Sequence, residues 1–176
     1  MSQLIQRMVR AARLDVHLYE EVEADPTALR QAIAVVVLSS FAAGLGAGGF
    51  SGGGLFLGAL FALIGWFIWA YLTYWLGAKL FPEPKTQADH GELLRTLGFS
   101  SSPGIIRILG LIPPIKGVVF LVASIWMLIA MIIAVRQALD YTSTWRAIGV
   151  CCVGWIVQLL TLAILFGLLG KGAGVP

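Results

Sequence analysis

Few side chains in this chain could carry chemistry, and their spacing argues against an enzyme. His17 and His90 stand in different segments without further ligands at metal-binding spacing, so we expect no metal site. The serines at 100–102 have no histidine nearby in the sequence that could act as their base. We therefore expect no catalytic residue, no enzymatic activity and no cofactor.

A run of serines before a proline interrupts an apolar segment. Proline inside a helix removes a backbone hydrogen bond, so the helix should kink or break at Pro103. Serine hydroxyls can bond the carbonyls that the break frees, or the break can form a polar notch beside a substrate path, as in transporters. Arg107 either extends to the headgroups or faces the bundle interior and binds a headgroup or an anion. The candidate polar site comprises Ser100, Ser101, Ser102, Pro103 and Arg107.

A glycine-rich stretch at 44–54 could suggest a phosphate-binding loop, but no Lys-Ser or Lys-Thr pair follows it and no strand precedes it. Small residues let helix backbones approach closely in lipid. We interpret the stretch as a tight turn with close helix packing. The packing glycines are Gly44, Gly46, Gly48, Gly49, Gly52, Gly53 and Gly54.

Membrane helices must position these residues, because the composition excludes a soluble protein. The 176 residues are 59% hydrophobic and 12% charged, with a mean hydropathy of +0.89, whereas ordinary soluble domains are about 25% charged. A net charge of +3 on so apolar a chain does not indicate nucleic acid, and we expect none as a partner. Cys151 and Cys152 are adjacent in an apolar run, which is typical of packing residues.

Apolar runs separated by turn signals predict five membrane crossings. About 20 helical residues cross a hydrocarbon layer of about 30 Å, so the charge-free residues 31–78 suffice for two. Asp25 before Pro26 marks one helix start, and Thr86 with Asp89 resembles a capping box that opens another. We predict an all-α polytopic membrane bundle with spans at about 31–49, 54–78, 91–113, 116–136 and 145–170, and a short tail at 171–176.

The basic residues predict the orientation. Lys and Arg collect on the cytoplasmic side, and with the N-terminus placed there nine of them lie on that side and three on the other. We expect a multi-pass protein of the cytoplasmic (inner) membrane, with the N-terminus in the cytoplasm and the C-terminus outside. The nine are Arg7, Arg10, Arg13, Arg30, Lys79, Lys85, Arg95, Arg136 and Arg146; the three are Arg107, Lys116 and Lys171.

Residues 1–30 predict a cytoplasmic amphipathic segment lying on the membrane surface. Its apolar positions share one helix face, and Arg7, Arg10 and Arg13 would face anionic headgroups. The acidic stretch at 20–25 is either a solvated cap on the first span or a docking surface for a basic partner. Farther along, Arg136 and Asp140 are four residues apart and predict a helical ion pair at the membrane interface.

Several short motifs occur in an order that resembles the Yip family (Ypt/Rab-interacting membrane proteins), in its prokaryotic branch. They are Gly91-Glu92-Leu93-Leu94-Arg95-Thr96-Leu97-Gly98-Phe99, Ser102-Pro103-Gly104, Leu109-Gly110-Leu111-Ile112-Pro113, Ser124-Ile125-Trp126-Met127-Leu128, Val135-Arg136-Gln137-Ala138 and Ser143-Thr144-Trp145-Arg146-Ala147. The resemblance implies a five-span helical protein with a cytosolic N-terminus. The resemblance also implies what is known of eukaryotic relatives, which associate with prenylated Rab GTPases, act in vesicle traffic between ER and Golgi, and carry an Asp-Leu-Tyr-Gly-Pro type of motif in their cytosolic region. Residues 15–20 lack its Gly-Pro, which argues against GTPase binding here.

Two functions remain open at this point. The first is a non-enzymatic scaffold or accessory subunit that contacts membrane lipids and forms a homo-oligomer or a larger membrane complex through small-residue faces. The second is a small transporter or channel with a path beside the broken third span. A scaffold predicts a dry bundle with a free apolar face, whereas a transporter predicts polar side chains around a cavity near mid-membrane.

Overall fold

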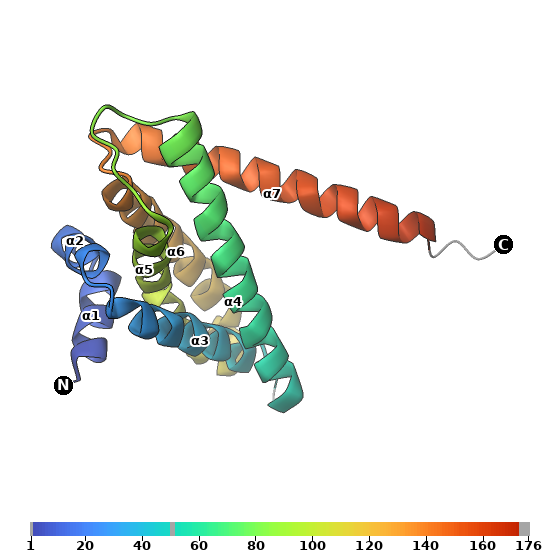
Figure 1. The fold of residues 1–176 in the computed structure, drawn as a ribbon. Helices are drawn as coiled ribbons and strands as arrows, with labels where there is room; N and C mark the ends of the chain where they lie inside the picture. Colours follow the sequence, from blue (N-terminus) through green and yellow to red (C-terminus); the bar gives the residue numbers. More distant parts are fainter. Residues whose placement is uncertain (1, 50–51, 173–176) are drawn as a thin grey trace.

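The computed structural model describes residues 2–49 and 52–172, with residues 161–172 as backbone only. The described residues form helices and no strand, so the predicted all-α membrane bundle is confirmed (Figure 1). The α-helices are α1 (Gln3–Ala12), α2 (Val16–Ala24), α3 (Ala28–Gly46), α4 (Gly52–Tyr74), α5 (His90–Phe99), α6 (Lys116–Ala138) and α7 (Thr144–Gly172). Between them lie a π-helix, η1 (Trp75–Leu80), and two 3₁₀ segments, η2 (Ser102–Leu111) and η3 (Pro113–Ile115).

Three helices in the described part of the chain are long and apolar enough to cross a membrane. They are Ala28–Gly46, Gly52–Leu80 and Pro113–Ala138, and they correspond to the first, second and fourth predicted spans. The fifth predicted span coincides with α7, whose apolar part with described side chains is Thr144–Leu160. The side chains of its second half and residues 173–176 of the tail lie outside the described residues. The chain is a multi-pass membrane protein.

The third predicted span is divided at the serine–proline break. Ten residues of α5 at about 1.5 Å per residue and ten of η2 at about 2.0 Å give roughly 35 Å, enough to cross the hydrocarbon layer. Its first part lies in the interior of the bundle, because α3, α4 and α6 pack around it and bury Leu97, Phe99 and Pro103. The end of η2 is exposed at Ile108, Leu109 and Leu111. A broken helix is tolerated at membrane depth only where protein shields it.

Glycines let α3 and α6 approach this segment closely. A Cβ atom on Gly98 would lie 2.6 Å from the Cβ atom of Ala32 in α3. A Cβ atom on Gly104 would overlap the hydroxyl of Ser39 in α3 and lie 2.8 Å from the sulfur of Met127 in α6. Both glycines therefore allow backbones to pack where any larger residue would push the helices apart.

The loops of the described bundle lie at two ends. At one end, which we call the N-terminal end, the Gln137 side chain donates to Glu20 at 3.0 Å and the Gln87 N–H donates to Asp140 at 3.3 Å. At the opposite end, the far end, the Lys116 ammonium donates to the Ala47 carbonyl at 2.7 Å. Helix α2, the 81–89 loop and the 139–143 loop thus lie together, whereas the end of α1 lies beside the middle of α6, where the Trp126 indole donates to the Ala12 carbonyl at 2.7 Å.

Helix α7 diverges from the rest of the bundle (Figure 1). It contacts α6, η1 and the end of α4, and its C-terminal part extends away from the other helices. The divergence leaves an apolar groove of about 770 Å³ between α4 and α7, with Phe61, Ile68 and Val157 among its walls.

Candidate functional site

The break after α5 lies beside a cavity of about 450 Å³ between α4, α5, α6 and α7. The cavity brings together Ser100, Ser101 and Arg107 of the candidate polar site with Ser124 and Gln158. Tryptophans and methionines form much of its remaining wall: Trp66, Trp69, Met127, Met131 and Trp155. Ser100, Ser101 and Arg107 therefore meet at one cleft, which is open to the surface of the bundle beside the exposed residues Ser124 and Trp155.

The three serines divide between backbone and cavity. The Ser100 hydroxyl donates to the Leu97 carbonyl at 2.7 Å, and the Ser102 hydroxyl donates to the Phe99 carbonyl at 2.7 Å. These two bonds satisfy carbonyls at the end of α5, where the helical ladder stops. Ser101 lines the cavity instead.

Arg107 turns toward α6. One guanidinium nitrogen, Nη2, donates to the Ser124 hydroxyl at 3.1 Å, and the guanidinium lies 5.7 Å from the centre of the Phe120 ring. The Nε–H group is buried without a hydrogen-bond partner among the described residues. The same is true of the indole N–H groups of Trp66 and Trp69. Three side chains of the cavity wall therefore carry buried N–H groups without a hydrogen-bond partner among the described residues.

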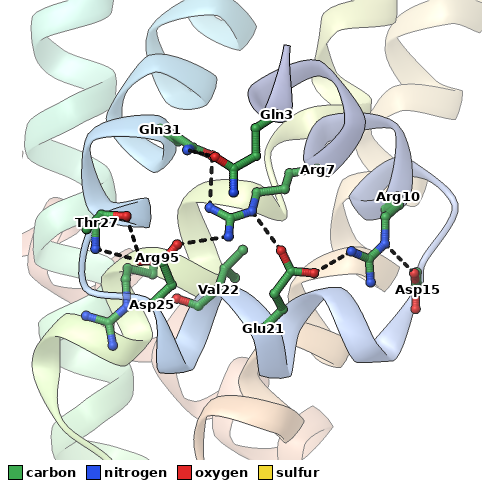
Figure 2. Close-up of polar contacts among 10 residues, drawn as sticks. All are labelled: Gln3, Arg7, Arg10, Asp15, Glu21, Val22, Asp25, Thr27, Gln31 and Arg95. Atoms are coloured by element: carbon green, nitrogen blue, oxygen red, sulfur yellow. Dashed lines mark hydrogen bonds and ion pairs between the residues drawn. The ribbon is translucent and has the colours of Figure 1, made fainter. Parts of the chain in front are cut away.

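A second polar centre fastens the N-terminal helices to the bundle (Figure 2). Arg7 is only 4% exposed. Its guanidinium donates to Glu21 at 3.0 Å, to Asp25 at 2.9 Å and to the Gln31 side chain at 3.1 Å. One side chain of α1 thus holds the acidic residues of α2 and the first turn of α3.

The prediction that Arg7 and Arg10 face lipid headgroups is wrong. Arg10 donates to Asp15 at 2.7 Å and also to Glu21, and these bonds lower the pKa values of both carboxyl groups. The physical reason is a sharp reversal at Leu14, whose φ of 61° folds α2 back so that its acidic residues meet the arginines of α1. Of the three arginines, Arg13 is the exposed one. Glu21 and Asp25 of the acidic stretch are therefore paired with arginine within the same chain.

Arg95 joins α5 to the end of α2. It is 8% exposed, and its guanidinium donates to the Val22 carbonyl at 2.9 Å and to the Glu23 carbonyl. These carbonyls belong to the last turn of α2, where helices leave acceptors unpaired and favour positive charge. Arg95 therefore caps α2.

Glu23 beside Arg95 is half-buried among other acidic groups. Burial, and then the nearby charges of Glu92 and Asp140, raise the pKa of Glu23 to about 7, although the charge of Arg95 opposes the shift. The Glu23 carboxyl thus titrates near neutral pH at the contact between α2 and the bundle.

The predicted ion pair of Arg136 with Asp140 does not form. Helix α6 ends two residues before Asp140, which has a φ of 51° and accepts from the Gln87 N–H. Arg136 donates to the Tyr141 carbonyl at 3.2 Å and to the Thr144 hydroxyl at 3.1 Å. The four-residue spacing favours a pair only while the helix continues.

Sequence reasoning missed Glu83, which ties the 81–89 loop to the start of α7. Its carboxylate accepts from the Thr142 N–H at 2.9 Å and from the Thr142 hydroxyl at 2.7 Å, which lowers the pKa of Glu83. Arg146 lies 3.4 Å away. Nothing in the local sequence marks Glu83 as different from an ordinary loop carboxylate.

The glycine-rich stretch serves several purposes. A Cβ atom on Gly46 would overlap the backbone carbonyl of Arg107, and one on Gly44 would lie 2.7 Å from Leu55. Gly48 has a φ of 92°, a turn conformation that favours glycine, and Gly49 beside it lies close to the Gly44 carbonyl. A Cβ atom on Gly52 or Gly53 would meet nothing within 4 Å, so these two glycines pack against no other helix of the same chain among the described residues.

Helix α4 has an open edge of small residues near the far end. Gly54 and Gly58 are exposed and four residues apart, so they lie one above the other on the same face. A Cβ atom on Gly58 would meet no atom within 4 Å. This edge differs from Gly98 and Gly104, whose space a neighbouring helix already fills.

Comparison with known protein families gives one match: the family model described as the Yip1 domain matches residues 17–165. The matched range covers both polar centres except for the residues before position 17, among them Arg7, Arg10 and Asp15, and it includes every motif on which the resemblance was based. No curated protein and no solved structure matches the chain.

Proposed function

The chain belongs to the Yip1 domain family, and from this membership we propose that it is a non-enzymatic membrane scaffold that pairs with a second copy of itself through α4. Its N-terminal end lies on the cytoplasmic side of the cytoplasmic membrane. The excess of Lys and Arg at that end supports this orientation. Folded together with the loops of that end, α2 forms the part of the scaffold available to cytoplasmic partners.

The observation that carries this proposal is the open Gly54–Gly58 edge. Two glycines four residues apart on a lipid-facing helix let a second helix approach closely, and van der Waals packing drives association in lipid. The space beside Gly58 is free in the single chain. A second copy is the favoured occupant because the same edge on two copies is self-complementary about a two-fold axis.

A leucine scan of α4 tests the proposal. Gly58→Leu should convert a dimer into a monomer, with at least a tenfold weaker association, when subunits are counted by single-molecule photobleaching in liposomes. Gly53→Leu is the matched control, because Gly53 also has free space but lies about 140° around the helix from Gly58. A monomeric wild type, or a Gly58→Leu variant that associates normally, would overturn the proposal.

The cavity at the break favours a second candidate, a small transporter or channel. Ser101 and Arg107 line a space beside a broken helix, as substrate sites in transporters do. Flux of a small anion into liposomes separates the two candidates. If Arg107→Ala and Pro103→Ala leave the flux unchanged, the cavity is no transport path.

A further inference from the structure

We propose that the cavity at the α5–η2 break binds the acidic head of an amphiphile, a carboxylate or phosphate that carries an acyl chain. The cavity of about 450 Å³ and the groove of about 770 Å³ are both within the usual size of ligand sites, roughly 300–1,000 Å³. Binding there is independent of pairing through α4.

Arg107 has no acidic partner in the membrane segments. An arginine stays ionised and an unpaired charge within a membrane is costly, so such residues normally have a partner. No Asp or Glu stands between Glu92 and Asp140, and none occurs in α3, α4 or α7. The membrane segments therefore offer Arg107 no counter-ion, and Ser124, which accepts one of its bonds, is neutral. An acidic ligand would supply the missing negative charge.

Hydrogen-bond donors without acceptors also favour an acidic ligand. Three buried N–H groups on side chains that line the cavity have no acceptor among the described residues: Arg107 Nε, Trp66 Nε1 and Trp69 Nε1. Guanidinium and indole nitrogens only donate. Leaving a buried donor unpaired costs about 1–3 kcal/mol in proteins generally. A carboxylate or phosphate has several acceptor oxygens and would accept from any of these donors that turns toward the cavity.

The cavity adjoins a space for the chain of the ligand. Gly65, Trp69 and Gln158 line both the cavity and the groove between α4 and α7, so an acyl chain in the groove would lie next to a head in the cavity. Ser124, the partner of Arg107, lies eight residues from the start of α6, about 12 Å from the far end of the bundle. A lipid head entering from that membrane surface reaches Arg107 without crossing the whole layer.

Native mass spectrometry of the full-length protein, released from detergent, tests the proposal with defined probes. Oleate and dioleoyl phosphatidate should bind at least tenfold more tightly than dioleoyl phosphatidylcholine, and the better of the two identifies the head as carboxylate or phosphate. Inorganic phosphate, which lacks a chain, should not displace them. Arg107→Gln should weaken binding at least tenfold, whereas Lys116→Gln, which removes a charge that bonds the Ala47 carbonyl, should change it less than twofold.

Trp69→Phe provides a second variant if Arg107→Gln fails to fold, since phenylalanine keeps an aromatic ring and loses the N–H group. It should weaken binding severalfold. Equal binding of phosphatidylcholine, displacement by inorganic phosphate, or unchanged binding by both variants would each overturn the proposal.

Discussion

Replacing Arg7 with methionine should release α1 and α2 from the bundle while the membrane spans stay folded. Methionine keeps an apolar stem that can pack where the arginine stem lies, but it removes the donors to Glu21, Asp25 and Gln31. The change therefore isolates the polar centre drawn in Figure 2.

The size of the effect follows from the exposure of the partners. Removing one member of a fully buried ion pair costs about 3–5 kcal/mol. Here the Glu21 and Asp25 side chains remain 42% and 26% exposed, so water replaces part of what they lose. Glu21 also keeps its bond to Arg10. We expect a loss of about 2–3 kcal/mol, which shifts the docking equilibrium of α1 and α2 roughly 30- to 150-fold.

Hydrogen exchange of the full chain in lipid nanodiscs measures this shift. Backbone amides of α1 and α2 should exchange faster by that factor, and amides of α3 and α6 should keep their protection. Arg13→Met is the control, because Arg13 belongs to the same basic set but is exposed and makes no side-chain hydrogen bond or ion pair within the described part of the chain. Unchanged protection in α1 and α2, or an equal loss throughout the bundle, would refute the reasoning.

Two further substitutions test other contacts. Glu23→Gln should flatten the pH dependence of stability: a folded-state pKa of about 7 against an ordinary 4.5 favours the protonated form, so stability falls as pH rises from about 4.5 through about 7. The pKa shift corresponds to roughly 3 kcal/mol, which we reduce to about 1–2 kcal/mol because the side chain is only half-buried. Thermal unfolding at mildly acidic and mildly alkaline pH measures this difference in stability. A Glu23→Gln variant with the wild-type pH profile contradicts the assignment. Gly46→Ala should destabilise by about 2–3 kcal/mol because the new Cβ atom overlaps the Arg107 carbonyl, whereas Gly117→Ala enters open space and should be neutral or slightly stabilising. Equal denaturation midpoints of the two alanine variants would disprove the close approach.

Apolar length predicted the spans well because the membrane imposes a minimum on it. The first, second and fourth predicted spans match the helices within three residues at each end. Short polar motifs predicted the exact start of a helix less well, because residues with the same three-residue spacing can occur one turn earlier or later in the sequence. The capping box forms not with Thr86 but one turn later, where Asp89 and Glu92 exchange bonds at 2.8 and 2.7 Å.

The contacts of the N-terminal helices could not be predicted from local sequence. Arginines near a membrane have two kinds of partner, lipid phosphates and protein carboxylates, and amphipathic spacing does not separate them. The reversal at Leu14 decides between them, and a leucine at positive φ has no local signature. Likewise, the packing glycines Gly98 and Gly104 were not predicted, since their neighbours come from distant helices.

The break and the cavity have a common cause. A segment with three serines, a proline and a 3₁₀ backbone cannot face lipid without leaving polar groups unpaired, so it must be enclosed. Helices α3 and α6 enclose it closely where Gly104 permits contact. On the side toward α4 and α7 the large side chains of Trp66, Trp69 and Trp155 line the remaining space, and α7 diverges. The polar segment is therefore shielded on one side by protein and faces a cavity on the other, which is where an unpaired arginine can meet a ligand.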